Sequence, residues 1–290
     1  MDGSLFGNPW EHLRLLSDDA RNAVLVDFLA RHAPGNRVLE VGCGTGVLSA
    51  IAARLGAQHV IAVEPTEIAD VAEALMKRNG LPVTVLRGRI EDLEPREVDV
   101  AFSELLNADP FYEGVVEVTN ATRPWVREGG LLAPQHLSVY AAAVRASDSA
   151  REARAALREV QGFARRFDLD FGPVLEGLQS DAPHTYVTLA EEPVGPAVLV
   201  HDLALGTGAT AESRVRIDLP VSEAGPVAGV MVWFEARMDD ALVLHNRPGE
   251  PSHWGQQVFA FMRERGVPAG GTLSVELSIE DGAMHARPTG

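Results

Sequence analysis

The sequence predicts a mixed α/β protein in which a parallel α/β half precedes a half built of antiparallel strands. Between Arg37 and Phe102, short apolar runs alternate with segments of helical pattern, as in a doubly wound sheet. From Ala197 onward, short apolar runs are separated by Gly, Pro and Asp turns, which is typical of consecutive strands. The chain has 290 residues, 46% of them apolar, which is enough for two domains or for one domain with a large appendage.

Charge and composition argue against several classes of function. The formal net charge of −16 repels nucleic acid and anionic lipid, so we expect neither as a partner. The same charge favours solubility and would attract a cationic substrate. Cys43 is the only cysteine, no secretory signal is visible, and no apolar run is long enough to span a bilayer. These features predict a cytoplasmic protein, and the nine scattered histidines indicate no metal site.

The segment 37–50, RVLEVGCGTGVLSA, predicts a ligand-binding turn. An apolar run ends at Gly42, Gly44 and Gly46, and helix-forming residues follow. Glycines permit positive φ and let a ligand approach the backbone, while the N-terminus of the next helix offers free N–H groups. We interpret Cys43 as a small residue that fits this turn and not as a nucleophile.

Acidic residues follow each of the next predicted strands. Glu64, Glu91 and Glu104 all come just after short apolar runs. The predicted strands cover 59–63, 81–87 and 98–102, and a helix is predicted over about 67–79. Because the C-terminal ends of parallel strands meet at one edge of a sheet, we expect these acids and the glycine turn to share a rim.

The spacing of the glycine turn favours S-adenosylmethionine over NAD as the ligand on that rim. The glycines follow G-x-G-x-G, whereas dinucleotide sites use G-x-G-x-x-G. Glu40 lies two residues before the first glycine, and Glu91 follows the third strand, where the amino group of an adenine would need an acceptor.

The segment 102–116, FSELLNADPFYEGVV, places two carboxylates among apolar and aromatic side chains. These are Glu104 and Glu113, and an unpaired charge is costly in such surroundings. Either the two acids lie on the surface beside a loop, or they bind a cation.

Together these segments resemble the protein arginine methyltransferase family over nearly the whole chain. The glycine turn is similar to the family's cofactor motif, and the 102–116 segment is similar to its double-glutamate loop. Further similarities are 12–21 to the N-terminal helix, 62–65 to the ribose-binding segment, 88–92 to the adenine loop, 131–144 to the segment leading into a β-barrel, and 251–261 (PSHWGQQVFAF) to the Thr-His-Trp loop. In the last of these, Ser252 stands in place of the threonine.

The resemblance implies a Rossmann-like cofactor domain followed by a β-barrel domain with a helical dimerisation arm. The N-terminal lid would cover residues 1–34, the Rossmann-like domain 35–143, and the barrel domain 144–290 with the arm at about 147–196. Such an arm docks on a partner's Rossmann half, so a head-to-tail homodimer is implied. The family's two lid tyrosines are missing, and only Phe6 lies near one of their positions.

The resemblance also implies residue roles. Glu104 and Glu113 would clamp a guanidinium, and His253 with Asp18 would accept a proton or orient the site. The cofactor would be held by Arg21, Glu40, Gly42, Gly44, Gly46, Glu64, Pro65, Arg89, Ile90, Glu91 and Glu104. The substrate would contact Glu104, Glu113, His12, Leu15, His253 and Trp254. The alternatives are a structural histidine at position 253 and a surface arginine at position 21.

The predicted activity is transfer of a methyl group from S-adenosylmethionine to a guanidino nitrogen of arginine. Free L-arginine or another small guanidino metabolite is slightly favoured, because the chain is compact and has no accessory recognition domain. Arginine within a polypeptide is the alternative. A non-catalytic partner protein that binds S-adenosylmethionine is an alternative of another class, and the intact glutamate pair argues against it. Leu15 stands where dimethylating members carry methionine, so the degree of methylation is not predicted.

Overall fold

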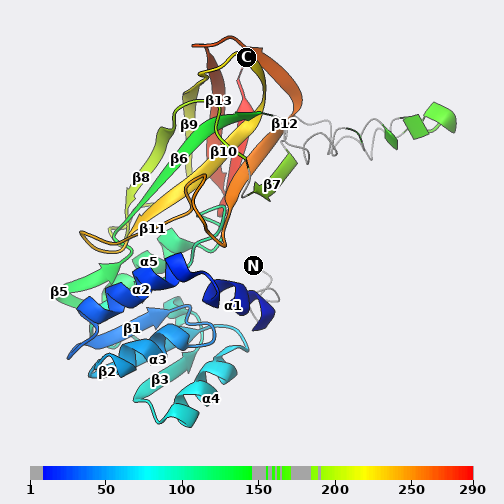
Figure 1. Cartoon of the computed structure of the whole chain (residues 1–290). Coiled ribbons are helices and arrows are strands. Elements are labelled where there is room, and N and C mark those ends of the chain that lie inside the picture. The colour runs from blue at the N-terminus through cyan, green and yellow to red at the C-terminus, as the bar shows by residue number, and fades with distance from the viewer. Residues whose placement is uncertain are drawn as a thin grey trace.

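The computed structural model describes residues 9–145, 155, 159–160, 162–163, 165–170, 184–188 and 191–289. Its strands form a parallel sheet from the first half of the chain and antiparallel sheets from the second half (Figure 1). The predicted α/β fold class is therefore confirmed. Among the described residues, no helix is long and apolar enough to cross a lipid bilayer.

The parallel sheet has the strand order β3-β2-β1-β4-β5. Its strands are β1 (Arg37–Val41), β2 (His59–Glu64), β3 (Val83–Arg87), β4 (Val98–Ser103) and β5 (Val126–Ala133). The strands predicted at 59–63, 81–87 and 98–102 are β2, β3 and β4. The chain adds β2 and β3 on one side of β1 and then β4 and β5 on the other side. The boundary between β1 and β4 is therefore a switch point, and ligands of such sheets bind beside it.

Helices cover both faces of the parallel sheet. They are α1 (Pro9–Leu16), α2 (Asp19–His32), α3 (Val47–Arg54), α4 (Ala69–Asn79) and α5 (Val115–Thr122), with short 3₁₀ turns at η1 (Ile90–Asp92) and η2 (Arg123–Trp125). On one face, Phe28 of α2 and Leu48 of α3 pack with Val38 of β1. On the other face, Val118 of α5 and Trp125 pack against β1, β2 and β4. The first of these cores continues without a break into the second half of the chain.

Glycines in the left-handed conformation mark the start of α3 and the end of α4. Gly46 has φ of 78°, and α3 begins immediately after it. Gly80 has φ of 61° and ends α4, because a left-handed residue at this position satisfies the last carbonyls of a helix. The predicted end of the 67–79 helix is confirmed, and the helix begins two residues later than predicted.

The second half of the chain forms two antiparallel sheets. The larger has the order β7-β12-β10-β6-β8 with β11 on β10, and the smaller has the order β14-β13-β9. The strands are β6 (His136–Arg145), β7 (His184–Thr188), β8 (Val198–Ala204), β9 (Ser213–Pro220), β10 (Gly225–Arg237), β11 (Val243–His245), β12 (Gln256–Val267), β13 (Thr272–Glu280) and β14 (Ala283–Pro288). Val232 and Phe234 from one sheet share a core with Val275 and Leu277 from the other. The predicted barrel is therefore not closed within the described residues, where no ladder joins the two sheets.

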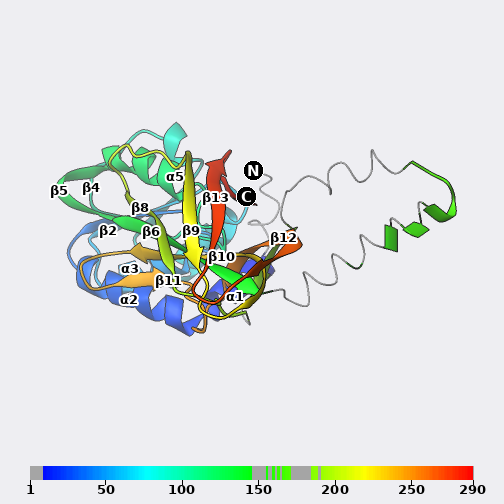
Figure 2. The same cartoon turned by 90° about the horizontal axis from the view of Figure 1, so that it is seen from above.

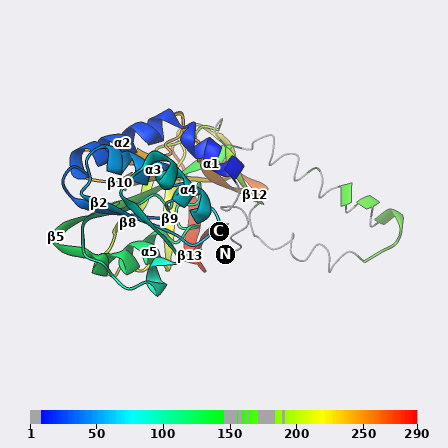
Figure 3. The same ribbon diagram turned by 90° about the horizontal axis from the view of Figure 1, so that it is seen from below.

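The change from the parallel sheet to the antiparallel sheets falls between β5 and β6. The domain boundary predicted at 143 lies within β6, which pairs with β8 and β10 over its length. The predicted arm at 147–196 falls largely outside the described residues, as does Phe6 in the predicted lid. Residues 184–188 of the predicted arm are described, and they belong to the larger antiparallel sheet because β7 pairs with β12. Figures 2 and 3 show the described helical residues between 155 and 166 lying to one side of both sheets.

Candidate active site

The glycine turn after β1 forms one wall of a site at the switch point. Gly42, Gly44 and Gly46 have φ values of 76°, 52° and 78°, which residues with a Cβ rarely adopt. A Cβ added at Gly44 would lie 2.5 Å from Cε1 of His12, and one at Gly42 would lie 2.6 Å from Cδ2 of Leu105. Positions 42 and 44 therefore leave no room for a Cβ, because the side chains of Leu105 and His12 approach the backbone closely.

Glu64 ends β2 beside this turn. Its Oε2 accepts a hydrogen bond from the backbone N–H of Gly44 at 2.9 Å. Its Oε1 accepts from the backbone N–H of Thr66 at 3.0 Å and from the hydroxyl of Thr66 at 2.7 Å. The side chain is thus fixed at the rim where the sequence predicted it, while the adjacent Pro65 is exposed.

The predicted adenine loop lies next to Glu64, because the N–H of Gly88 donates to the carbonyl of Glu64 at 3.1 Å. Ile90 is buried in the core at 3% exposure. Glu91 stays partly exposed, and the guanidinium of Arg89 is 3.4 Å from its carboxylate. The carboxylate of Glu91 is thus available at this edge, whereas the side chain of Ile90 belongs to the core.

Glu40 lies under the glycine turn. It is 3% exposed, and the hydroxyl of Ser49 on α3 donates to its carboxylate. Burial raises the pKa of Glu40 to about 8, although the bond from Ser49 acts in the opposite direction. Burial likewise raises the pKa of the Cys43 thiol, which supports its interpretation as an unreactive residue of the turn.

A cavity of about 60 Å³ lies between the glycine turn and the N-terminal helices. Its lining includes His12, Leu15, Arg21, Glu40, Glu104 and the turn itself. This volume corresponds to about two water molecules, whereas ligand pockets enclose several hundred Å³. A nucleoside-sized ligand therefore needs more room than the turn and the side chains around it leave in this arrangement. His12 and Leu15, predicted to contact the substrate, face the predicted cofactor turn here.

Arg21 and Glu104 form a buried ion pair across the site. Nε of Arg21 donates to Oε2 of Glu104 at 2.7 Å, and Nη2 donates to the same oxygen. The two side chains are 6% and 5% exposed. The sequence analysis assigned Arg21 to the cofactor and Glu104 mainly to the substrate, and it did not predict this contact. Pairing neutralises two charges that would each be costly to bury alone.

The two glutamates of the 102–116 segment are brought together. Burial, followed by the charge of Glu104, raises the pKa of Glu113 to about 8. Oε1 of Glu113 accepts a hydrogen bond from the side-chain amide of Asn107 at 3.2 Å. Oε1 of Glu104 is buried and has no hydrogen-bond partner among the described residues. The site therefore offers carboxylate oxygens that a cation can use, and the alternative of two surface acids is wrong.

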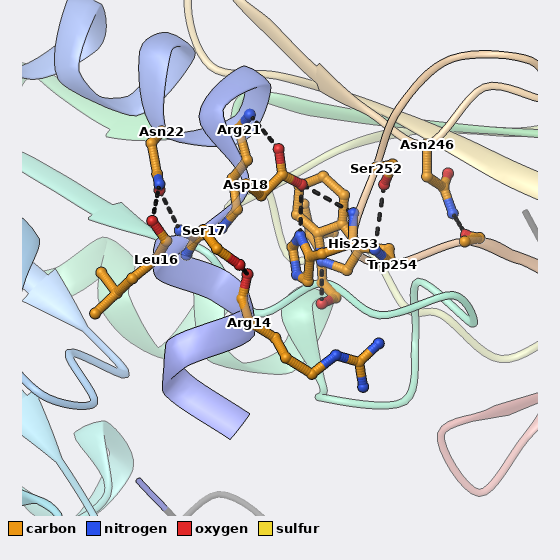
Figure 4. Close-up of polar contacts among 12 residues, drawn as sticks. Arg14, Leu16, Ser17, Asp18, Arg21, Asn22, Asn246, Ser252, His253 and Trp254 are labelled. Atoms are coloured by element: carbon orange, nitrogen blue, oxygen red, sulfur yellow. Dashed lines mark hydrogen bonds and ion pairs between the residues drawn. The ribbon is translucent and has the colours of Figure 1, made fainter. Parts of the chain in front are cut away.

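Asp18 and His253 form a second pair (Figure 4), and the charge of Glu104 acts on this histidine. Oδ2 of Asp18 accepts from the backbone N–H of His253 at 2.9 Å and lies 2.7 Å from Nδ1 of its ring. Oδ1 accepts from the N–H of Arg21 and caps α2. Burial alone would raise the pKa of Asp18, but the hydrogen bonds from Arg21 and His253 lower it. Burial lowers the pKa of His253 despite the opposing bond to Asp18.

Comparison with known proteins shows which proteins this chain is similar to. A sequence profile described as a methyltransferase domain matches residues 38–130. A probable protein arginine N-methyltransferase 6 of Arabidopsis thaliana is 38% identical over 144 residues, which cover 47% of this chain and 33% of that relative. A probable protein arginine N-methyltransferase 6.1 of Oryza sativa subsp. indica is 28% identical over 86% of this chain and 74% of the relative.

The fold matches as well. The crystal structure of Arabidopsis thaliana protein arginine methyltransferase 10 has a TM-score of 0.82 at 25% identity, covering 94% of this chain and 88% of that one. The chain is therefore similar in sequence and in fold to protein arginine N-methyltransferases. The family resemblance predicted from the sequence is confirmed.

The methyltransferase uses S-adenosylmethionine as its cofactor, as the glycine spacing predicted. Its structure fits this cofactor at the glycine turn, where three positive-φ glycines leave the backbone accessible and Glu64 ends the neighbouring strand. The predictions of an enzyme and of its methyl donor are confirmed. The NAD-type alternative has no support in these matches.

Several residues and contacts that support the methyltransferase site were not predicted, among them a bond made by Trp254, which the sequence had assigned to the substrate. Asn246 is fully buried, and its amide donates to the carbonyl of Gly255 at 2.6 Å, which holds the loop that carries His253. The indole N–H of Trp254 donates to the carbonyl of Leu106 at 2.8 Å and joins that loop to the double-glutamate loop. Asn107 lies in the 102–116 segment, between Glu104 and Glu113. This position of a short amide was the only sequence feature that indicated a role for it.

Proposed function

We propose that this methyltransferase methylates a guanidino nitrogen of arginine within a polypeptide. The observation that carries the proposal is the meeting of Glu104 and Glu113 in one largely buried site. A guanidinium is planar and cationic and has five N–H donors, so two carboxylates can bind it through parallel hydrogen bonds. Few other substrates would neutralise the charge of two carboxylates in such buried surroundings.

The two glutamates act by orientation and charge. Removing a proton from a guanidinium before attack would cost about 7 kcal/mol or more at pH 7. Glu104 and Glu113 instead hold the cation, draw its positive charge toward the nitrogens that they contact, and leave the remaining nitrogen free to attack. The cation in turn offsets the burial of Glu113 and its repulsion by Glu104, which together raise the pKa of Glu113.

The cofactor supplies an electrophilic methyl group on its sulfonium. Glu64 would accept hydrogen bonds from a ribose, and the loop that carries Ile90 and Glu91 would hold an adenine. Arg21 would hold the cofactor's carboxylate, and its bond to Oε2 of Glu104 also fixes the orientation of that glutamate. One arginine would thus connect the cofactor side of the site with the substrate side.

The proton released by the substrate needs an acceptor. Nε2 of His253 is buried and has no hydrogen-bond partner among the described residues, while Nδ1 is held by Asp18. Because burial lowers the pKa of this imidazole, its neutral form is favoured and can accept a proton. We assign that role to His253, with Asp18 fixing the ring.

A polypeptide is the substrate class that we favour. The relatives named above are protein arginine N-methyltransferases by description, which supports the polypeptide alternative over the slight preference for free arginine given by the sequence. The net charge of −16 would also raise the local concentration of basic polypeptide segments.

Mass spectrometry of the products tests the proposal. The purified enzyme and S-adenosylmethionine are incubated with an Arg-Gly-rich peptide and, separately, with free L-arginine. Added methyl mass on the peptide supports the proposal, and methylation of free arginine alone would replace it with a small-molecule activity. Calorimetric binding of S-adenosylmethionine with no product from either substrate would support the non-catalytic alternative.

We also propose that the enzyme works as a head-to-tail homodimer. The support is the family resemblance and the position of the described 155–166 residues to one side of the sheets (Figure 2). Light scattering should give twice the mass of 31.1 kDa. A monomer that is fully active at the same concentration would contradict the proposal.

A further inference from the structure

We infer that Asn107 is a positioning residue of this enzyme: its side-chain amide orients Glu113 toward the guanidinium of the substrate. The inference rests on the proposed arginine methylation and adds a residue to its machinery. Asn107 lies between the two glutamates on the loop that joins β4 to α5.

The two ends of the Asn107 side chain have separate partners. Oδ1 accepts a hydrogen bond from the N–H of Ala108 at 2.7 Å. Nδ2 donates to Oε1 of Glu113 at 3.2 Å. The reversed amide would place an oxygen against a carboxylate and an NH₂ against an N–H, so both contacts fix the same orientation. One end of the amide is therefore tied to the backbone, and the other end points at the catalytic glutamate.

The loop on which Asn107 lies is anchored on both sides. The carbonyl of Leu106 accepts the indole N–H of Trp254 at 2.8 Å. Oδ1 of Asp109 accepts the N–H of Phe111 at 3.1 Å, and Oδ2 accepts the N–H of Met284 in β14 at 2.8 Å. Phe111 is 1% exposed. These contacts hold the backbone on both sides of Asn107. The hydrogen bond from its side chain to Glu113 therefore has a defined direction.

Charged groups from three elements face this pair of glutamates. Glu104 at the end of β4 repels Glu113, while Arg21 on α2 attracts Glu113 but donates from Nε and Nη2 to Glu104. His253, from the loop before β12, lies within the electrostatic reach of Glu104. Among the described residues, the amide of Asn107 is the side-chain donor that hydrogen-bonds to Glu113 and not to Glu104. It favours the ionised carboxylate that must bind the substrate, because a donor stabilises the charged form.

Two substitutions separate this role from a purely structural one. Asn107→Ala removes both contacts. Asn107→Asp keeps an acceptor for the N–H of Ala108 but replaces the donor to Glu113 with a second negative charge. A positioning role predicts that kcat/KM for the arginine peptide falls about tenfold in Asn107→Ala and further in Asn107→Asp, because a hydrogen bond to a charged group is lost in both and repulsion is added in the second.

A backbone role predicts the reverse order. In that case Asn107→Asp would behave like the wild type and only Asn107→Ala would be impaired. Either this order or equal activity of all three proteins would overturn the inference. Asn79→Asp makes the same change in charge at the exposed end of α4, and it should leave kcat/KM unchanged.

Titration of Glu113 by carbon-13 NMR gives a readout that does not depend on turnover. We expect both variants to raise the pKa of Glu113, Asn107→Asp by roughly one unit, and the acidic limb of the kcat/KM profile to move to higher pH with it. An unchanged titration would refute the contact itself. If the wild type methylates no arginine peptide, the proposed function fails, while the titration still decides whether Asn107 acts on Glu113.

Discussion

Replacing Glu113 with glutamine should abolish methylation and yet stabilise the folded protein. Burial and the charge of Glu104 raise the pKa of Glu113 from 4.5 to about 8. A carboxyl whose pKa is higher in the folded state than in the unfolded state destabilises the fold increasingly as pH rises between those two values. At 1.36 kcal/mol per pH unit, the cost at pH 7 is roughly 3 kcal/mol. Glutamine carries no such cost, and its oxygen can still accept the hydrogen bond from Asn107.

Urea denaturation of both proteins at several values between pH 5 and pH 8 measures this effect. We expect the free energies of unfolding to be similar near pH 5 and the glutamine variant to become the more stable one as pH rises. Glu117→Gln is the control, because Glu117 lies exposed on the neighbouring α5. The reasoning is refuted if the difference between Glu113→Gln and the wild type does not change with pH, or if the variant is less stable at pH 8.

Three further predictions concern neighbouring contacts. Glu104→Gln should abolish methylation and lower stability by about 3–5 kcal/mol, because the buried Arg21 guanidinium loses its carboxylate; an unchanged Tm would contradict this. Glu64→Ala should weaken S-adenosylmethionine binding in calorimetry, and unchanged affinity would refute the placement of the ribose. Trp254→Phe should lower the free energy of unfolding by about 1–2 kcal/mol, because the buried carbonyl of Leu106 loses its donor; chemical denaturation that shows no loss would argue against that bond.

The sequence predicts those parts of the site that depend on local order along the chain. Glu64 and Glu104 were placed correctly because each follows a buried strand, and the ends of parallel strands meet at one edge. The pairing of Arg21 with Glu104 joins residues 83 positions apart, and no local pattern encodes that distance. The described strands of the predicted barrel form two sheets with no ladder between them, and such detail depends on the register and twist of many strands, which no local pattern specifies. The hydrogen bond from Asn107 depends on one loop conformation, which alternating hydrophobicity does not specify.

The carboxylate of Asp18 has a consequence for the order in which the molecule becomes active. One of its oxygens caps α2 near the start of the chain, and the other holds His253, which lies 235 positions later. The ribosome synthesises the glycine turn, the acids of the rim and both loop glutamates long before His253. N-terminal units also generally fold first. A nascent chain can therefore assemble the cofactor side early and still lack the histidine that we propose as its proton acceptor. The enzyme would then start working only when its last strands have folded onto its first helices.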